Sequence, residues 1–275
     1  AQVIDLSSAT VLPGLIDAHT HMFNNPTPKM SRERSTIIAI QNLQSDLRAG
    51  VTAARDMSSH GNGYADVDLR DAINRGDLDG PRFQVSGRGI RWSAEPPKAP
   101  DNPLADTVIR SLEEGRAAVR DAAAHGVDWI KLYPGGAYSF GPNGEDRYVT
   151  TYPLPVLQGL IEETHKLGKK AACHVFGGDG LQYSITAGCD TVEHGYALTQ
   201  AQLDEMVKKK LDFDPTLARY NAPFMDDNDA KNTGGKYRMV PIFERAVSLA
   251  VKTKGLRTMV GSGVDGSTFV HGTQA

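Results

Sequence analysis

The feature that most constrains the fold is a regular alternation of short β-rich runs with helical patterns along the chain. The predicted strands are Val11–Asp17, Val51–Asp56, Arg82–Gly87, Val127–Leu132, Lys170–Val175, Asp190–His194, Leu211–Thr216 and Arg257–Gly261. Strands that alternate with helices in this way are typical of a parallel sheet covered by helices, so the sequence predicts an α/β fold.

Helical patterns fill the segments between these runs. The predicted helices are Ser31–Ala49, Asp66–Arg75, Asp106–His125, Pro153–Leu167, Gly180–Ala187, Thr199–Lys209 and Val240–Lys254. Several end at a glycine, such as Gly50, Gly126 and Gly168, which is the residue that most readily ends a helix. Eight strands favour a closed (β/α)8 TIM barrel. An open doubly wound sheet is the alternative, although no GxGxxG motif opens its first helix.

Composition excludes some classes of partner. The net charge of −3 argues against nucleic acid as a partner, and the sequence has no run of about 18 apolar residues that would predict a membrane span. Cys173 and Cys189 lie in apolar runs, which predicts two small core residues and no disulfide. Unpaired cysteines favour a reducing compartment, so we expect a cytoplasmic location, although removal of a leader ahead of Ala1 stays open.

Two long insertions follow predicted strands. Residues 91–106 read RWSAEPPKAPDNPLAD, and residues 133–153 read YPGGAYSFGPNGEDRYVTTYP. In a barrel both would lie at the C-terminal face of the sheet, where active sites are built. Two interpretations stay open, namely ordinary surface loops and a lid or wall for a substrate.

Histidines gather at the predicted ends of strands. His19 and His21 follow the first run in VLPGLIDAHTHM, and they point the same way because side chains alternate along a strand. His174 and His194 stand at the ends of two later runs. Strand ends converge in a barrel, so four imidazoles there indicate a metal site. A structural role stays open for an isolated HxH.

The remaining histidines carry less information. His60, His125 and His165 stand in a loop or at helix ends among polar residues, so we interpret them as solvated or capping side chains. His271 follows the last predicted strand.

Lys131 and Asp265 extend this pattern. Lys131 lies in the apolar run VDWIKLYPGG, where a lysine is costly unless it is paired, modified, or able to extend its amine to the strand end. One interpretation is a carboxylated lysine that bridges two metal ions. Asp265, in VGSGVDGS, is either a turn residue or a metal ligand and general base.

The segments VLPGLIDAHTHM, GVTAARD, GVDWIKLY, AACHVFG, TVEHGY and GSGVDGSTFVHG resemble the amidohydrolase superfamily of metal-dependent hydrolases, in its imidazolonepropionase-like and prolidase-like branch. The resemblance implies a barrel with two divalent metal ions, usually zinc, and a bridging hydroxide as nucleophile. The ligands that it implies are His19, His21 and Asp265 for one ion, His174 and His194 for the other, and Lys131 between them, carboxylated by carbon dioxide or bicarbonate. Asp265 would also be the catalytic base.

The resemblance also suggests a class of small-molecule substrate. Members of this branch cleave Xaa-Pro and other dipeptides, N-acyl amino acids, or amides of the ochratoxin type, all of which carry a carboxylate beside the scissile amide. A cation or hydrogen-bond donor should bind that carboxylate. The candidates are Arg219 and Tyr220 after the seventh strand, with His271 and Tyr133 as additions. A surface arginine and packed tyrosines are the alternative interpretation.

Departures from the family pattern keep other functions open. Gly263 and Val264 separate Asp265 from the strand, and GRGIRWSAEPP replaces a histidine-bearing motif after the third strand. The alternatives are hydrolysis of cyclic amides, lactones or amidines, deamination, and an inactive fragment. Deaminases of the superfamily typically lack the lysine of the fourth strand, so Lys131 argues against that chemistry.

The ends of the chain also depart from the family. Residues 1–10 resemble the last strand of an N-terminal β-sandwich, and residues 11–275 a barrel without its last helix. A barrel truncated in this way should expose apolar surface. That surface predicts poor solubility or a covering partner, and homo-oligomerisation stays open.

Overall fold

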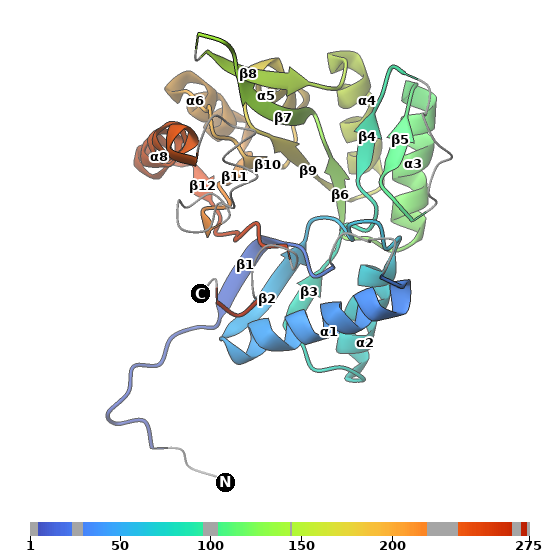
Figure 1. Ribbon diagram of the computed structural model, residues 1–275, viewed down its shortest axis with the longest axis vertical. Helices are drawn as coiled ribbons and strands as arrows, with labels where there is room; N and C mark the ends of the chain where they lie inside the picture. The colour runs from blue at the N-terminus through green and yellow to red at the C-terminus, as the bar shows by residue number, and fades with distance from the viewer. Residues whose placement is uncertain are drawn as a thin grey trace.

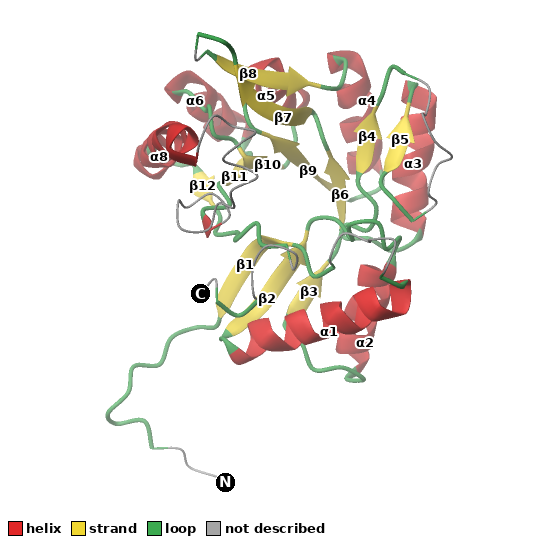
Figure 2. Ribbon diagram, in the orientation of Figure 1, coloured by secondary structure: helices red, strands yellow, loops and turns green. Residues whose placement is uncertain are grey.

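The computed structural model describes residues 5–23, 30–95, 104–143, 145–218, 236–265 and 271–273. Their strands form two parallel sheets and a separate antiparallel hairpin, and helices pack on the outer faces of both sheets (Figures 1 and 2). The predicted α/β fold is therefore confirmed for the part of the chain that the structure describes.

The smaller sheet contains the first three predicted strands. Its order is β1 (Leu15–Thr20), β2 (Val51–Asp56) and β3 (Arg82–Gln84), and all neighbours are parallel. The larger sheet has the order β12-β11-β10-β9-β6-β4-β5, again with parallel neighbours. Its strands are β4 (Ile90–Trp92), β5 (Thr107–Ile109), β6 (Trp129–Leu132), β9 (Lys170–Val175), β10 (Thr191–His194), β11 (Asp212–Asp214) and β12 (Arg257–Thr258).

Backbone hydrogen bonds join the two sheets. At one seam the Ala18 amide donates to the carbonyl of Val260 (2.9 Å), and the His21 amide donates to that of Val264 (2.8 Å). At the other, the Trp129 amide donates to the carbonyl of Val85 (3.1 Å). The described strands do not form one continuous ladder, so the parallel sheets of the predicted barrel are present and its closure is not detected.

Helices connect the strands as the sequence predicts. They are α1 (Arg32–Arg48), α2 (Ala65–Arg75), α3 (Leu112–Ala124), α4 (Leu154–Lys166), α5 (Gly178–Ala187), α6 (Gln200–Lys209) and α8 (Lys236–Lys252). The Ser31 hydroxyl caps α1 by accepting the Arg34 amide (3.2 Å), and the left-handed Gly76 (φ 79°) ends α2. The predicted start of α3 at residue 106 is wrong, because residues 107–109 pair as β5. Among the described residues, no helix is both long and apolar enough to cross a membrane.

The insertion after β6 forms the hairpin β7 (Gly135–Phe140) and β8 (Asp146–Thr150). Tyr138 packs edge-on against Phe176, with ring centroids 5.0 Å apart, and Phe176 follows β9 directly. The hairpin therefore packs beside the C-terminal end of the larger sheet (Figure 1). That position agrees with a wall for a substrate, which stays a prediction.

The structure corrects the prediction for the two cysteines. Cys173 and Cys189 are fully buried as expected, but they form a disulfide bond, with their Cα atoms 6.1 Å apart. Cys173 lies in β9 and Cys189 stands just before β10, and these parallel neighbours bring the two cysteines within disulfide range. Disulfides persist mainly in oxidising compartments, so the cysteines no longer support a reducing one.

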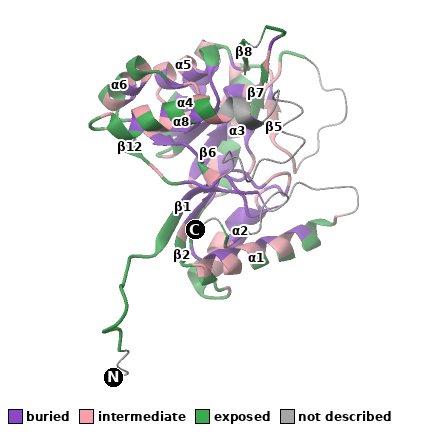
Figure 3. Cartoon of the chain, turned by 60° about the vertical axis from the view of Figure 1, so that its left-hand side comes forward, coloured by how far each residue is buried: buried purple, intermediate pink, exposed green. Residues whose placement is uncertain are grey.

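An apolar surface is exposed where β1 meets the segment after β12. Ile16 and Val260 have 63% and 71% of their surface exposed, and with Leu15 and Leu217 they line a groove of about 240 Å³. In Figure 3 the beginning of β1 is exposed and its end is buried. The expectation that a truncated barrel exposes apolar surface stays a prediction. Residues 5–10 form a turn without a strand, and the domain boundary at residue 10 stays a prediction.

Candidate metal centre

The two histidines of the HxH motif lie at the seam between the sheets. The Nδ1 atom of His19 lies 2.6 Å from the Oε2 atom of Glu193, and its Nε2 atom is buried without a partner among the described residues. Nδ1 of His21 donates to the carbonyl of Ser58 (3.2 Å). The two ring centroids are 5.2 Å apart, so both imidazoles border one small volume, as predicted.

His174 and His194 lie one register position apart on the neighbouring parallel strands β9 and β10. Their centroids are 4.5 Å apart, and Nε2 of His194 is 2.8 Å from Nδ1 of His174. His194 is also 5.0 Å from His19, ring to ring, so the structure brings the four imidazoles together.

The backbone of His194 is unusual at this point. It has a φ angle of 75°, which is rare for a residue other than glycine and is typical of constrained functional sites. Its Nδ1 atom lies 2.8 Å from the hydroxyl oxygen of Thr216, which itself donates to the carbonyl of Pro215. Nδ1 of His194 is therefore the donor, and Nε2 carries the lone pair that faces His174.

Lys131 lies in β6 with 1% of its surface exposed. Its Nζ atom is 5.4 Å from the centroid of the Tyr133 ring, which in turn lies 5.3 Å from the ring of His174. The pKa of this amine is lowered from 10.5 to about 8, mainly by burial and also by the charges of Arg55 and Arg91, while the charge of Glu193 acts in the opposite direction. With that pKa, roughly a tenth of the amine is uncharged at pH 7. An uncharged amine is the form that reacts with carbon dioxide, as carboxylation of Lys131 would require.

Asp265 reaches the centre through its backbone, which forms a parallel bridge with His21. Its surface is 7% exposed. Burial lowers the pKa of His60, and the charge of Asp265 acts in the opposite direction. The two residues inserted before Asp265 therefore still leave it beside the HxH motif.

His60 belongs to this centre, and the interpretation of it as a solvated or capping side chain is wrong. Its ring stacks on His21 with centroids 4.0 Å apart and planes 20° from parallel, and its Nδ1 atom is buried. His125 does end α3 as a cap, and the exposed His165 pairs with Asp190. The signal for His60 was its place after β2, in the same kind of loop that carries the other histidines.

The structure places the predicted substrate-binding residues differently. Tyr133 lies beside the centre, with its ring 5.3 Å from that of His174. His271 is not brought into it, because its ring is fully buried with Nδ1 3.0 Å from Asp46 and Nε2 donating to the carbonyl of His21 (3.2 Å). Arg219 and Tyr220 lie outside the described residues.

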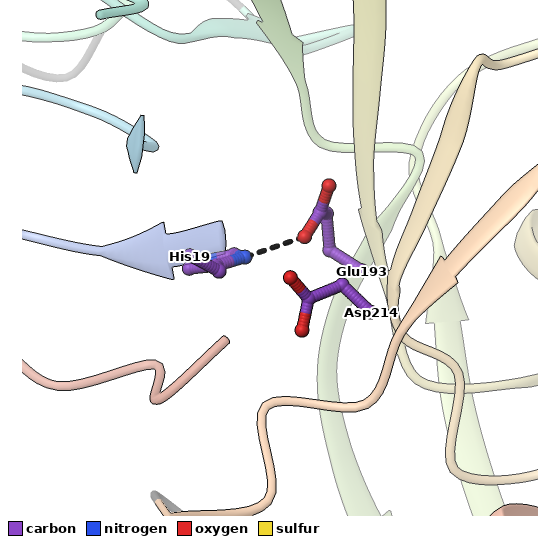
Figure 4. A group of neighbouring side chains, drawn as sticks. All are labelled: His19, Glu193 and Asp214. Atoms are coloured by element: carbon purple, nitrogen blue, oxygen red, sulfur yellow. Dashed lines mark hydrogen bonds and ion pairs between the residues drawn. The ribbon is translucent and has the colours of Figure 1, made fainter. Parts of the chain in front are cut away.

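The sequence analysis missed a buried polar network beneath His19. Glu193 and Asp214 are fully buried, and His19, Glu193 and Asp214 each place one ligand atom within 4.8 Å of the others (Figure 4). Burial alone would raise the pKa of Glu193, but the charges of Arg55 and His19 outweigh it and hold that pKa below the usual range. Burial and the nearby charge of Glu193 raise the pKa of Asp214 to about 8.

The donor set fits a divalent metal ion. Imidazole nitrogens and carboxylate oxygens are the ligands that zinc prefers, together with thiolate. The buried, unpartnered Nε2 atom of His19 is the feature expected of a ligand atom, because a buried polar group without a partner is otherwise costly. The residues present therefore agree with the metal that the resemblance implies.

Comparison with known proteins gives the same family. A model of the amidohydrolase family matches residues 10–268. A Mycobacterium tuberculosis protein is 27% identical over 266 residues, which are 95% of this chain and 66% of the relative. The ochratoxinase of Aspergillus niger is 25% identical over 231 residues, 73% of this chain and 46% of that protein. The chain thus spans just under two thirds of the mycobacterial relative and less than half of the fungal one.

Solved structures match over most of the chain. A Xaa-Pro dipeptidase with bound methionine superposes with a TM-score of 0.77 at 24% identity, covering 95% of this chain and 68% of that one. A. niger ochratoxinase superposes with a TM-score of 0.73 at 20% identity, covering 91% and 63%. At these identities the structures show a shared fold, and the match of the family model shows that the chain belongs to the amidohydrolase family.

Proposed function

We propose that this chain carries the metal centre of a hydrolase that cleaves an amide or peptide C–N bond in a small carboxylate-bearing substrate. That class includes Xaa-Pro dipeptides, N-acyl amino acids and ochratoxin-like amides. The observation that carries the proposal is the convergence of four imidazoles, from β1, β9 and β10, with the buried Lys131 of β6. The names of two similar proteins, a Xaa-Pro dipeptidase and an ochratoxinase, support the substrate class.

The metal ligands in this proposal are those that the family resemblance implies. His19, His21 and Asp265 would hold one divalent ion, His174 and His194 a second, and carboxylated Lys131 would lie between them. Zinc is the metal that fits best, and when bound it would polarise the amide carbonyl and lower the pKa of water. Carboxylation would convert the cationic Lys131 into an anionic oxygen ligand, which removes the repulsion between a buried ammonium and two cations.

Asp265 acts first as the general base and then as the general acid in the proposed reaction. A carboxylate oxygen of Asp265 accepts a proton from the attacking water as the oxygen adds to the amide carbon. The same group then donates that proton to the leaving nitrogen while the C–N bond breaks. The products are a carboxylic acid and an amine, and Asp265 returns to its ionised form. Its backbone bridge to His21 fixes it beside the centre.

Arg91 and Tyr133 supply a place for the substrate carboxylate. The guanidinium carbon of Arg91 lies 3.6 Å from the centroid of the Tyr133 ring, and that ring borders His174. The Arg91 side chain is 48% exposed and donates through Nε to Asp106 (2.5 Å). A partly exposed guanidinium keeps donors that can reach an anion. Arg91 therefore joins Arg219 and Tyr220 as a candidate.

The test combines metal content with substrate choice. The chain would be expressed with zinc and bicarbonate, and the metal per chain measured by elemental mass spectrometry. We expect about two ions per chain, and hydrolysis of dipeptides or N-acyl amino acids that weakens when the substrate carboxylate is converted to a carboxamide. About one ion would favour a mononuclear enzyme. A chain without metal, or equal rates on acid and carboxamide, would contradict the proposal.

A further inference from the structure

We infer that Glu193 is a positioning residue that fixes the tautomer and ring orientation of His19, so that Nε2 of His19 faces the metal centre. The inference rests on the proposed function for its metal, and on the contacts of Glu193 for its geometry. Glu193 lies in β10 and His19 in β1, so their pairing also joins the two sheets.

The contact between Glu193 and His19 determines where the ring proton lies. Nδ1 of His19 is 2.6 Å from Oε2 of Glu193, and both side chains are buried (Figure 4). An ionised carboxylate only accepts hydrogen bonds, so Nδ1 must carry the proton. The neutral ring then has its lone pair on Nε2, which is the buried atom without a partner among the described residues. A carboxylate behind a ligating histidine is the common arrangement at metal sites.

The second carboxylate oxygen of Glu193 is also in use. Oε1 accepts from Nη2 of Arg55 (2.8 Å) and from the hydroxyl of Thr191. With Oε2 directed at His19, both oxygens are engaged with protein donors, which favours a supporting role for Glu193 over direct ligation. The short distances among His19, Glu193 and Asp214 therefore describe a support beneath the centre.

Arg55 makes that support rigid across the seam. Its Nε atom donates to the carbonyl of Ala18, the residue before His19, while Nη2 holds Glu193. Its guanidinium carbon lies 4.4 Å from the centroid of the Trp129 ring. One arginine thus ties the β1 backbone next to His19 to the β10 carboxylate that orients the His19 ring.

The decisive variant is Glu193→Gln, which keeps the shape and replaces one oxygen with a donor. If the amide nitrogen faces Arg55, two donors oppose each other. If it faces His19, Nδ1 must give up its proton and Nε2 becomes protonated. We expect zinc affinity, measured by competition with a chelator, to fall about 10- to 100-fold while saturating stoichiometry stays at the wild-type value.

A second readout does not depend on metal or activity. Long-range 1H–15N NMR of the metal-free protein distinguishes the two tautomers. The ring signals of His19 are assigned because they are absent from the spectrum of His19→Gln. We expect the Nδ1-protonated form in the wild type and a large share of the Nε2-protonated form in Glu193→Gln. A wild-type ring protonated at Nε2, or a tautomer unchanged in the variant, would overturn the inference.

Two further variants provide a milder change at Glu193 and a matched control. Thr191→Val removes one hydrogen-bond donor to Glu193 and leaves the carboxylate, so it should weaken zinc binding less than Glu193→Gln does. It replaces Glu193→Gln in the test if Glu193→Gln does not fold. Asp190→Asn removes the charge from another carboxylate–histidine pair, with His165 (2.9 Å), and should leave zinc affinity unchanged.

The stoichiometry separates the remaining outcomes. Loss of one ion per chain at saturating zinc in Glu193→Gln would make Glu193 a ligand and overturn the positioning role. A wild type that binds no zinc would contradict the proposed function alone, and the NMR tautomer would still decide the inference.

Discussion

The imidazole of His60 stacks on that of His21, with ring centroids 4.0 Å apart and planes 20° from parallel. The loop that carries His60 follows β2 and has two residues other than glycine with positive φ, Ser58 (142°) and His60 itself (45°). Ser58 also provides the carbonyl that accepts from Nδ1 of His21. The loop after β2 therefore contacts the His21 ring twice, through a hydrogen bond from Nδ1 and through stacking on the ring face.

Replacement of His60 tests how far this stacking orients a metal ligand. Aromatic pairs contribute about 0.5–1.5 kcal/mol beyond their buried area, so His60→Ala should weaken zinc binding by up to roughly tenfold. His60→Phe keeps the stacked face and should restore most of the affinity. Chelator competition measures both variants. If His60→Phe binds zinc as weakly as His60→Ala, a ring nitrogen matters and stacking alone is not the explanation.

The bounds of several strands could be predicted from the sequence, because paired strands coincide with hydrophobic runs. The predicted Val51–Asp56 and Lys170–Val175 match β2 and β9 throughout. The first strand was placed too early, because Val11 and Leu12 are apolar but 71% and 76% exposed, and pairing with β2 begins at Leu15. Apolar sequence alone does not show where a neighbouring strand begins.

The histidines of the site were predictable from strand ends, but their support was not. Alternation along a strand places Glu193 and His194 on opposite faces. The left-handed backbone of His194 (φ 75°) breaks this alternation, so both side chains reach the interior. The disulfide was missed for a related reason, because the sequence does not show that Cys173 and Cys189 meet between adjacent strands. Both features depend on tertiary placement.

Lys131→Met should separate metal binding from the stability of the metal-free protein. The variant removes the proposed bridging ligand, so we expect loss of tight binding of both ions. Burial lowers the Lys131 pKa from 10.5 to about 8, a difference worth roughly 3 kcal/mol between the charged and neutral forms. The metal-free variant should therefore be more stable than the wild type at pH 7, as chemical denaturation would show.

The pH dependence of the wild type has a definite sign. The folded-state pKa of Lys131 lies below its unfolded value, so the cost of the buried ammonium is fully present below pH 8. It is relieved as the pH rises from about 8 to 10.5, and Lys131→Met should lose its advantage over that window. Unchanged metal content in the variant would remove Lys131 from the ligand set, and an advantage independent of pH would show that the charge is not the cause.

The Cys173–Cys189 disulfide should stabilise the fold measurably. It links residues 16 apart, and closing a loop of that length in the unfolded chain is worth roughly 3 kcal/mol. We expect Cys173→Ala/Cys189→Ala to lower the melting temperature by several degrees. The native protein should resist alkylation until it is both unfolded and reduced, because both cysteines are fully buried. Two free thiols in the unfolded, unreduced protein would show that the bond does not form.

His271 and Asp46 should contribute to stability and not to substrate affinity. Both side chains are fully buried, Nδ1 of His271 lies 3.0 Å from Asp46, and Nε2 donates to the carbonyl of His21. Replacement of one partner leaves the other buried without its hydrogen bond, at a cost of about 1–3 kcal/mol. His271→Leu should therefore lower the free energy of unfolding by that amount, measured on the metal-free protein.

The comparison that decides the role of His271 is between stability and KM. If His271 bound the substrate carboxylate, His271→Leu would raise KM for the acid substrate and leave KM for its carboxamide unchanged. A supporting role moves both KM values little and lowers stability, because the ring contacts Asp46 and the backbone of His21. Asp46→Asn should then lower stability as His271→Leu does, and the double variant should be less destabilised than the sum of the two, since the residues form one pair.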